Sequence, residues 1–215
     1  MKQAVLTLAA FALFGTHFGQ LGGSFAGQAQ ETRPPDADKL NPDSYGDPEA
    51  YAVYAAVLPK VWNWELHEPK SLVFREETEF SPTESIKQLC VKGGRDFNSK
   101  WGSTLKAYVT VNQTPRRLLR MFPIEKNYIL VPQRELSELI GKSNWQDFYA
   151  RYPEAKSFVS MSSVGFNTEK TKALLTMTYH CGLLCMEGTY YLMEKKNGTW
   201  VRASVSNVTS CVWAS

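Results

Sequence analysis

The feature that most constrains the fold is a series of β-type segments at the end of the chain. Four segments rich in branched and aromatic side chains, separated by turn residues, have the composition of strands: 158–166, 171–180, 186–195 and 199–205. Asn197-Gly198 indicates a two-residue hairpin, because both central positions of a type I′ turn need a positive φ. Connections this short permit antiparallel pairing but no parallel crossover. The sequence therefore predicts an antiparallel β-meander here.

Before residue 157 the spacing of apolar residues is mainly helical. Two aromatic stripes recur at positions i, i+3, i+4 and i+7: Tyr51, Tyr54, Ala55 and Leu58, and then Trp145, Phe148, Tyr149 and Tyr152. Asp47-Pro48 and Asn144 fit the starts of these helices. We interpret the stripes as core positions.

Further elements are expected between the two stripes, with helices over 95–111 and 133–140, the first of them broken by Gly102, and strands over 71–78 and 126–131. Helices first and strands afterwards indicate an α+β domain. We predict that the N-terminal helices pack on one face of the C-terminal antiparallel β-meander.

The N-terminal residues have the pattern of a secretory signal peptide. Lys2 precedes an uncharged apolar stretch over 4–14, which is too short to span a bilayer, and a small-residue cleavage pattern ends at Ala29. We expect a signal peptide over 1–29, a proline-rich flexible arm over 30–47 and a single α+β domain over 48–215. The mature chain is expected to lack a transmembrane anchor and to be exported, to the periplasm or the extracellular space.

The charge pattern excludes one class of partner. The formal net charge is +3, and basic residues alternate with acidic ones. The cluster formed by Arg116, Arg117 and Arg120 could touch an anion, but helical spacing favours a solvated face. Nucleic acid is therefore not expected, and the partner would be an unknown envelope protein or a small ligand.

Four cysteines in an exported chain predict two disulfides. A bond between Cys181 and Cys185 would close a loop of about five residues and stabilise by about 2 kcal/mol. A bond between Cys90 and Cys211 would close about 120 residues and stabilise by about 5 kcal/mol. We favour this arrangement because Cys181 and Cys185 are always near each other, and cross-pairing stays an alternative.

A thiol-redox or zinc site is the second interpretation of the same region. His180 stands beside Cys181 and Cys185, and Cys90 or Cys211 could complete a tetrahedral zinc set. An oxidising compartment removes the thiolates that zinc requires. We therefore expect no metal and no cofactor.

Acid–base chemistry has few candidate groups. Beyond the signal peptide the chain has two histidines, His67 and His180, and it contains no recognised catalytic motif. Glu76 and Glu77, with Glu79 nearby, form the one notable carboxylate group, which a polar strand end explains best. The competing hypothesis is a hydrolase-like enzyme that uses Glu76 or Glu77 with His67 or tyrosines in a cleft between sheet and helices.

The C-terminal part of the chain contains five distinctive motifs: Val164-Gly165-Phe166-Asn167, Cys181-Gly182-Leu183-Leu184-Cys185, Gly188-Thr189-Tyr190-Tyr191-Leu192, Gly198-Thr199-Trp200 and Trp213. Together they resemble the pattern of an uncharacterised family of exported bacterial proteins. Met186 departs from the family pattern, which has glycine after the second cysteine. The resemblance implies bacterial origin and export, and it implies no activity.

The sequence favours a disulfide-braced binding or accessory protein over an enzyme. Leu183 and Leu184, between two cysteines at a predicted bend, are the first candidate binding residues, and Glu76 and Glu77 are the second.

Overall fold

The computed structural model describes residues 43–61, 69–79, 95–141, 145–204 and 212–214. The predicted signal peptide, most of the predicted arm, Asn144, His67, Cys90 and Cys211 lie outside these residues. The described part is an α+β fold that combines helices with a mixed sheet.

Four helices and ten strands are described. The helices are α2 (Pro48–Val61), α4 (Arg95–Val111), α5 (Gln133–Ile140) and α6 (Trp145–Arg151). The strands are β1 (Ser44–Tyr45), β2 (Leu72–Arg75), β3 (Arg117–Leu118), β4 (Tyr128–Val131), β5 (Phe158–Met161), β6 (Gly165–Phe166), β7 (Lys172–Gly182), β8 (Cys185–Lys196), β9 (Thr199–Arg202) and β10 (Val212–Ala214).

The main sheet is mixed, so the predicted antiparallel meander accounts for only part of it. Its central order is β10-β8-β7-β5-β2-β4, and β6 and β9 pair with β7 and β8. The strands β5, β7, β8 and β9 pair antiparallel along the chain, as predicted. However, β2 pairs in parallel with both β4 and β5. Parallel pairs need long crossovers, and the segments that contain α4, α5 and α6 supply them.

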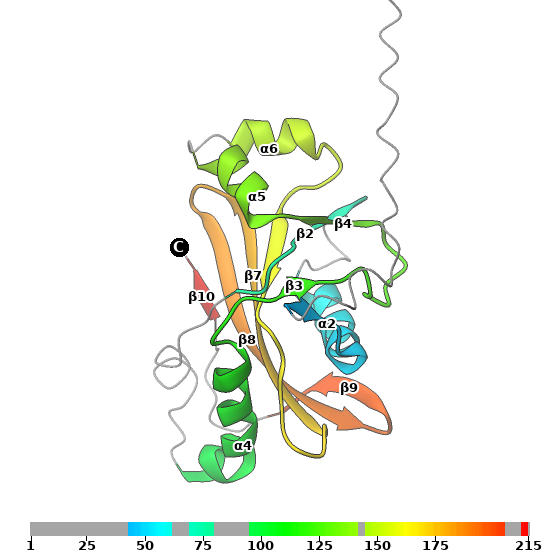
Figure 1. Cartoon of the computed structure of the whole chain (residues 1–215), viewed down its shortest axis with the longest axis vertical. Coiled ribbons are helices and arrows are strands. Elements are labelled where there is room, and N and C mark those ends of the chain that lie inside the picture. The colour runs from blue at the N-terminus through cyan, green and yellow to red at the C-terminus, as the bar shows by residue number, and fades with distance from the viewer. Residues whose placement is uncertain (1–42, 62–68, 80–94, 142–144, 205–211, 215) are drawn as a thin grey trace, which may run out of the picture. The chain divides into compact units, whose positions relative to one another are not determined.

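Helices cover both faces of the sheet, which corrects the prediction of a single covered face (Figure 1). Helix α2 packs in one cluster with Leu175 and Tyr191. Trp101 of α4 packs in another cluster with Leu174 and Tyr190. Because consecutive side chains of a strand point to opposite faces, α2 and α4 lie on opposite sides of β7 and β8.

The sequence of β7 contains the signal for this two-sided burial. From Ala173 to Met177 every residue is buried, and the segment is a nearly continuous apolar run. A strand that faces water on one side alternates apolar and polar residues instead. This apolar run is therefore typical of a strand that is buried on both faces of the sheet.

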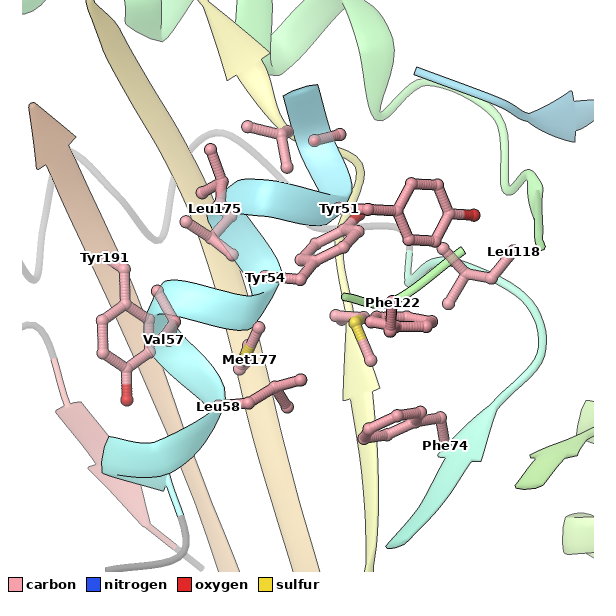
Figure 2. Packing of buried hydrophobic residues seen from close by; sticks show 14 of the residues in the cluster. Tyr51, Tyr54, Val57, Leu58, Phe74, Leu118, Phe122, Leu175, Met177 and Tyr191 are labelled. Carbon is pink, nitrogen blue, oxygen red and sulfur yellow. The ribbon is translucent and has the colours of Figure 1, made fainter. Parts of the chain in front are cut away.

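An aromatic cluster joins α2 to the sheet. Tyr51, Tyr54 and Phe122 pack against one another, with ring centroids between 4.9 and 5.8 Å apart, and Phe122 in turn packs on Phe74 of β2 (Figure 2). The Tyr51 hydroxyl donates to the Tyr45 carbonyl at 2.8 Å and accepts from the Leu119 amide at 2.6 Å. The predicted aromatic stripe of this helix is therefore part of the core.

The last residues of the predicted flexible arm belong to the packed fold. Strand β1 pairs in parallel with β3, and Tyr45 is buried. The Tyr45 hydroxyl accepts from the Val164 amide at 2.9 Å. The packed part therefore begins before residue 48, because Tyr45 is buried in the core.

Strand β6 lies unusually close to α4. Gly165 is buried, and a Cβ atom at this position would come nearer than 3.0 Å to the backbone N and Cα atoms of Tyr108. Real Cβ atoms essentially never show such a distance. Glycine is therefore required here by the approach of two backbones, and not by a positive φ.

Candidate functional site

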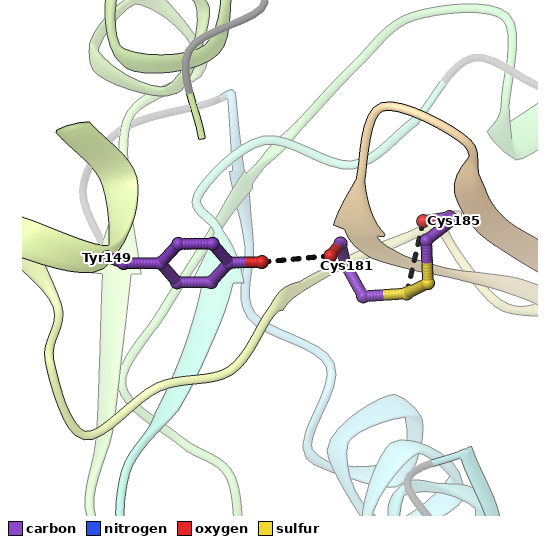
Figure 3. Close-up of a disulfide and its surroundings, with 3 residues drawn as sticks. All are labelled: Tyr149, Cys181 and Cys185. Carbon is purple, nitrogen blue, oxygen red and sulfur yellow. Dashed lines mark hydrogen bonds between the residues drawn. A yellow bond between two sulfur atoms is a disulfide. The ribbon is translucent and has the colours of Figure 1, made fainter. Parts of the chain in front are cut away.

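The β7–β8 hairpin contains the predicted disulfide. The two strands pair antiparallel up to Gly182 and Cys185, and the chain turns between them. Cys181 is bonded to Cys185, with their Cα atoms 5.1 Å apart (Figure 3). This pairing confirms one of the two predicted bonds. The other two cysteines lie outside the described residues.

The disulfide lies where the antiparallel pairing of β7 with β8 becomes irregular. His180 pairs with Met186 and Gly182 pairs with Cys185, so Cys181 is the extra residue of a β-bulge. Met186, the residue after the second cysteine, is not among the described residues with a positive φ. The bend therefore forms without glycine at this position.

Two large apolar side chains project from the turn. Leu183 is 64% exposed and Leu184 is 91% exposed. Both predicted binding residues therefore lie at the surface. In an isolated domain these two exposed side chains gain no free energy from burial. The turn therefore presents apolar surface to a partner.

Helix α6 supports the hairpin from the side. The Tyr149 hydroxyl donates to the Cys181 carbonyl at 2.9 Å (Figure 3). The Trp145 ring stacks on Phe158 with centroids 5.8 Å apart, and Phe158 stacks on His180 with centroids 4.3 Å apart. The second aromatic stripe therefore packs in the core, and it supports the end of the β7–β8 hairpin next to the turn.

A cluster of polar side chains joins three strands below the turn. The Ser160 hydroxyl donates to Glu79 Oε1, and the Thr178 hydroxyl donates to Glu79 Oε2 at 3.1 Å. His180 Nε2 lies 2.8 Å from Ser160 Oγ, and Arg75 Nη1 lies 3.8 Å from Glu79 Oε1. The backbone of Glu79 is also held, because its amide donates to the carbonyl of Met161 at 2.8 Å.

The hydrogen bonds assign the protons in this cluster. A hydroxyl has one proton, and that of Ser160 is directed at Glu79, so His180 Nε2 is the donor toward Ser160 Oγ. Burial of the Glu79 carboxyl raises its pKa, but the neighbouring His180, Ser160 and Arg75 groups lower the pKa by more. The net effect places the pKa below its ordinary value, and Glu79 is a carboxylate at neutral pH.

The Glu79, Ser160 and His180 cluster contains the residue types of a catalytic nucleophile with its base, but it does not have their arrangement. A catalytic serine gives its proton to histidine and stands where a substrate can reach it. Ser160 is 0% exposed and its proton goes to a carboxylate, while His180 donates to it. The cluster is therefore a hydrogen-bonded network centred on Glu79, of the kind that fixes strand register, and Arg75 Nε is buried beside it without a hydrogen-bond partner in the described part.

Glu76 and Glu77, the other predicted site residues, have separate partners. Glu76 Oε1 forms an ion pair with Arg117 at 2.7 Å. Glu77 Oε2 accepts from the amide of Gln133 at 2.8 Å, where α5 begins and backbone amides lack helical partners. The structure thus gives each of the two carboxylates its own structural contact, on a different segment of the chain.

In the described ranges, no group of three or more His, Cys, Asp or Glu side chains is placed to hold a metal ion. Cys181 and Cys185 share a disulfide and offer no thiolate. None of the helices in these ranges has both the length and the apolar character needed to cross a bilayer.

Sequence reasoning did not bring Glu79, Ser160 and His180 together. They come from three segments whose contact depends on strand register, which the sequence does not specify for parallel pairs. A usable signal was the presence of Ser160 and Thr178 in segments that are otherwise apolar.

Comparison with protein-family models, with curated proteins and with solved structures found no match to this chain.

Proposed function

We propose that this chain is an exported, disulfide-braced binding or accessory protein that contacts its partner through the tip of the β7–β8 hairpin, defined as residues 181–185. The observation that carries the proposal is the exposure of Leu183 and Leu184 on a cross-linked turn. The partner is an envelope protein with an apolar recess.

The energetics of the tip fit an anchor for such a partner. Complete burial of a leucine side chain is worth about 1.5–3 kcal/mol. A turn that is already held by a covalent bond loses less conformational freedom on binding than an open loop does. Two adjacent leucines therefore supply the apolar centre of a contact, and polar residues around them would complete it.

Export and membership of the exported bacterial family are parts of this proposal. They are supported by the signal-peptide pattern over 1–29 and by the C-terminal motifs. A disulfide at an exposed turn also fits an oxidising compartment. N-terminal sequencing of the protein recovered from the cell envelope should show a start near residue 27 or 30, and an intact Met1 would contradict export.

The test of the binding proposal compares two double variants with equal added charge. In the tip variant, Leu183→Asp and Leu184→Asp place two carboxylates on the turn. In the control, Asn197→Asp and Thr199→Asp place two carboxylates at the opposite end of β8, where both positions are exposed. Each tagged protein is used to capture partners from envelope extract, and circular dichroism verifies that both variants keep the wild-type fold.

The wild type and the control should retain the same captured protein, and the tip variant should lose it by about tenfold or more, as expected when a central apolar anchor is removed. The captured protein should then bind the purified wild type directly in a titration. Equal capture by the tip variant would overturn the assignment of the contact site.

A further inference from the structure

The Cys181–Cys185 bond differs from a disulfide that holds a core together. Leu183, Leu184 and Cys185 are exposed, and Cys181 is half-buried. A thiol in solution can therefore approach the bond from the Cys185 side. Exposed disulfides are the ones that are most readily reduced.

The strands below the turn do not depend on this bond. β7 and β8 pair continuously from Lys172 and Glu194 to His180 and Met186 before the bulge. Leu174 and Leu175 of β7 pack into clusters on the two opposite faces of the sheet. A bond that closes only five residues at the end of this ladder stabilises by about 2 kcal/mol, which is less than the roughly 5–15 kcal/mol by which a domain is ordinarily stable. The domain should therefore stay folded when the bond is opened.

The two halves of the tip are held unequally. The Cys181 carbonyl accepts from the Tyr149 hydroxyl at 2.9 Å, which anchors that residue to α6. Cys181 Sγ also lies 3.2 Å from the Cys185 carbonyl oxygen, which would accept from a Cys181 thiol. Leu183 and Leu184, in contrast, project into solvent. Opening the bond therefore releases residues 182–185 and leaves Cys181 in place.

We propose that the Cys181–Cys185 disulfide is a reducible lock that controls the shape of the tip, and that its reaction partner is a protein or small-molecule dithiol. This inference rests on the proposed function, because it adds regulation to the same contact site. In the oxidised form the leucines are presented in one arrangement, and in the reduced form that arrangement is lost while the domain stays folded.

The reaction is a two-electron thiol–disulfide exchange. A thiolate of the dithiol attacks Cys185 Sγ, the bond to Cys181 Sγ breaks, and Cys181 leaves as a thiolate that takes up a proton. The second thiol of the reagent, as its thiolate, attacks the reagent's sulfur in the mixed disulfide and releases Cys185, which is protonated in turn. The reagent ends as a disulfide, and its two protons reside on the two cysteines.

The chemical test uses the full chain and dithiothreitol as the dithiol. Free thiols are alkylated under native conditions, and peptide mapping distinguishes Cys181 and Cys185 from Cys90 and Cys211. We expect Cys181 and Cys185 to be alkylated while the far-ultraviolet circular dichroism is unchanged. Amide hydrogen exchange should rise by about tenfold or more at residues 182–185 and stay constant at 172–178.

A variant with Cys181→Ala and Cys185→Ala isolates this bond from the other two cysteines. It should reproduce the fast exchange at the tip without any reductant, and dithiothreitol should then leave the tip unchanged. The proposal is overturned if the native protein resists reduction at Cys181 and Cys185, if this variant is unfolded, or if tip exchange is equal in the oxidised and reduced proteins.

A second measurement separates this proposal from the proposed function. Reduction should weaken capture of the partner by about tenfold, as the loss of a pre-organised contact predicts. If the aspartate tip variant loses its partner but reduction leaves capture unchanged, the lock is wrong and the contact site stands. If the aspartate variant keeps its partner, the contact site is wrong whatever the thiol measurements show.

Discussion

Substitution of Gly165 by alanine should destabilise the domain more strongly than the gain of one methyl group suggests. The added Cβ would stand nearer than 3.0 Å to the backbone of Tyr108, where ordinary contact begins at 3.4 Å. Backbone atoms cannot rotate away as a flexible side chain can, so α4 must withdraw from β6 by several tenths of an ångström. That movement separates Trp101 and Tyr108 from Leu174 and Tyr190.

The size of the effect follows from the contacts that the withdrawal weakens. A large buried side chain makes roughly 40–60 atomic contacts of about 0.1–0.2 kcal/mol each, and a gap of about 0.5–1 Å forfeits a quarter to a half of each affected contact. Only the sheet-facing sides of Trp101 and Tyr108 are affected. We therefore expect Gly165→Ala to lower the free energy of unfolding by about 2–4 kcal/mol, within the range of strongly disruptive core changes.

The assay is urea denaturation of the full chain followed by circular dichroism. Gly102→Ala is the matched control, because a Cβ at this position of α4 meets nothing within 4 Å. Alanine is favoured over glycine in a helix by about 1 kcal/mol, so this control should be stabilised. A loss below about 1 kcal/mol for Gly165→Ala would refute the claim that two backbones meet at this glycine.

Two further predictions concern buried polar groups. The folded-state pKa of Glu79 lies below its ordinary value, so this carboxyl stabilises the fold above pH about 4.5, and the contribution is lost as pH falls through the folded pKa. Glu79→Gln should therefore reduce stability at pH 7. In acid titrations followed by circular dichroism, this variant should lose less stability between pH 5 and 3 than the wild type does. Asn112→Ala should cost about 2–4 kcal/mol in urea denaturation, because the Asn112 side chain donates to the carbonyls of Tyr108 and Ser163 and accepts from the Ser163 amide. An acid response of Glu79→Gln equal to that of the wild type, or a neutral effect of Asn112→Ala, would contradict these roles.

The local elements could be predicted well because local patterns determine them. The helices expected over 95–111 and 133–140 match α4 and α5 at both ends. Gly102 did not break α4, since one glycine costs only about 1 kcal/mol in a helix. The Asn197-Gly198 turn forms with positive φ at both residues, as the residue types require. The Cys181–Cys185 bond could also be predicted, because these residues are close in any conformation of the chain.

The arrangement of the elements could not be predicted in the same way. The parallel pairing of β2 with β4 and β5 joins segments that are separated by whole helices, and no local pattern specifies such a partner. The polar cluster around Glu79 depends on that pairing, so it was missed with it. The position of Leu183 and Leu184 at a hairpin bend was inferred from the two cysteines around them, and this inference needed no long-range information.

The position of β2 between β4 and β5 also has a consequence for the order of folding. β7, β8 and β9 are joined by two-residue turns, and β5 is joined to β7 through the segment that contains β6, so these strands can associate early, because closing a short loop costs little entropy. β2 and β4 can enter the sheet only after β5 offers an edge, and each entry brings together distant parts of the chain. Because a chain is made from its N-terminus, β2 is synthesised before the C-terminal strands, and until they form its apolar residues Leu72, Val73 and Phe74 depend on protection from aggregation.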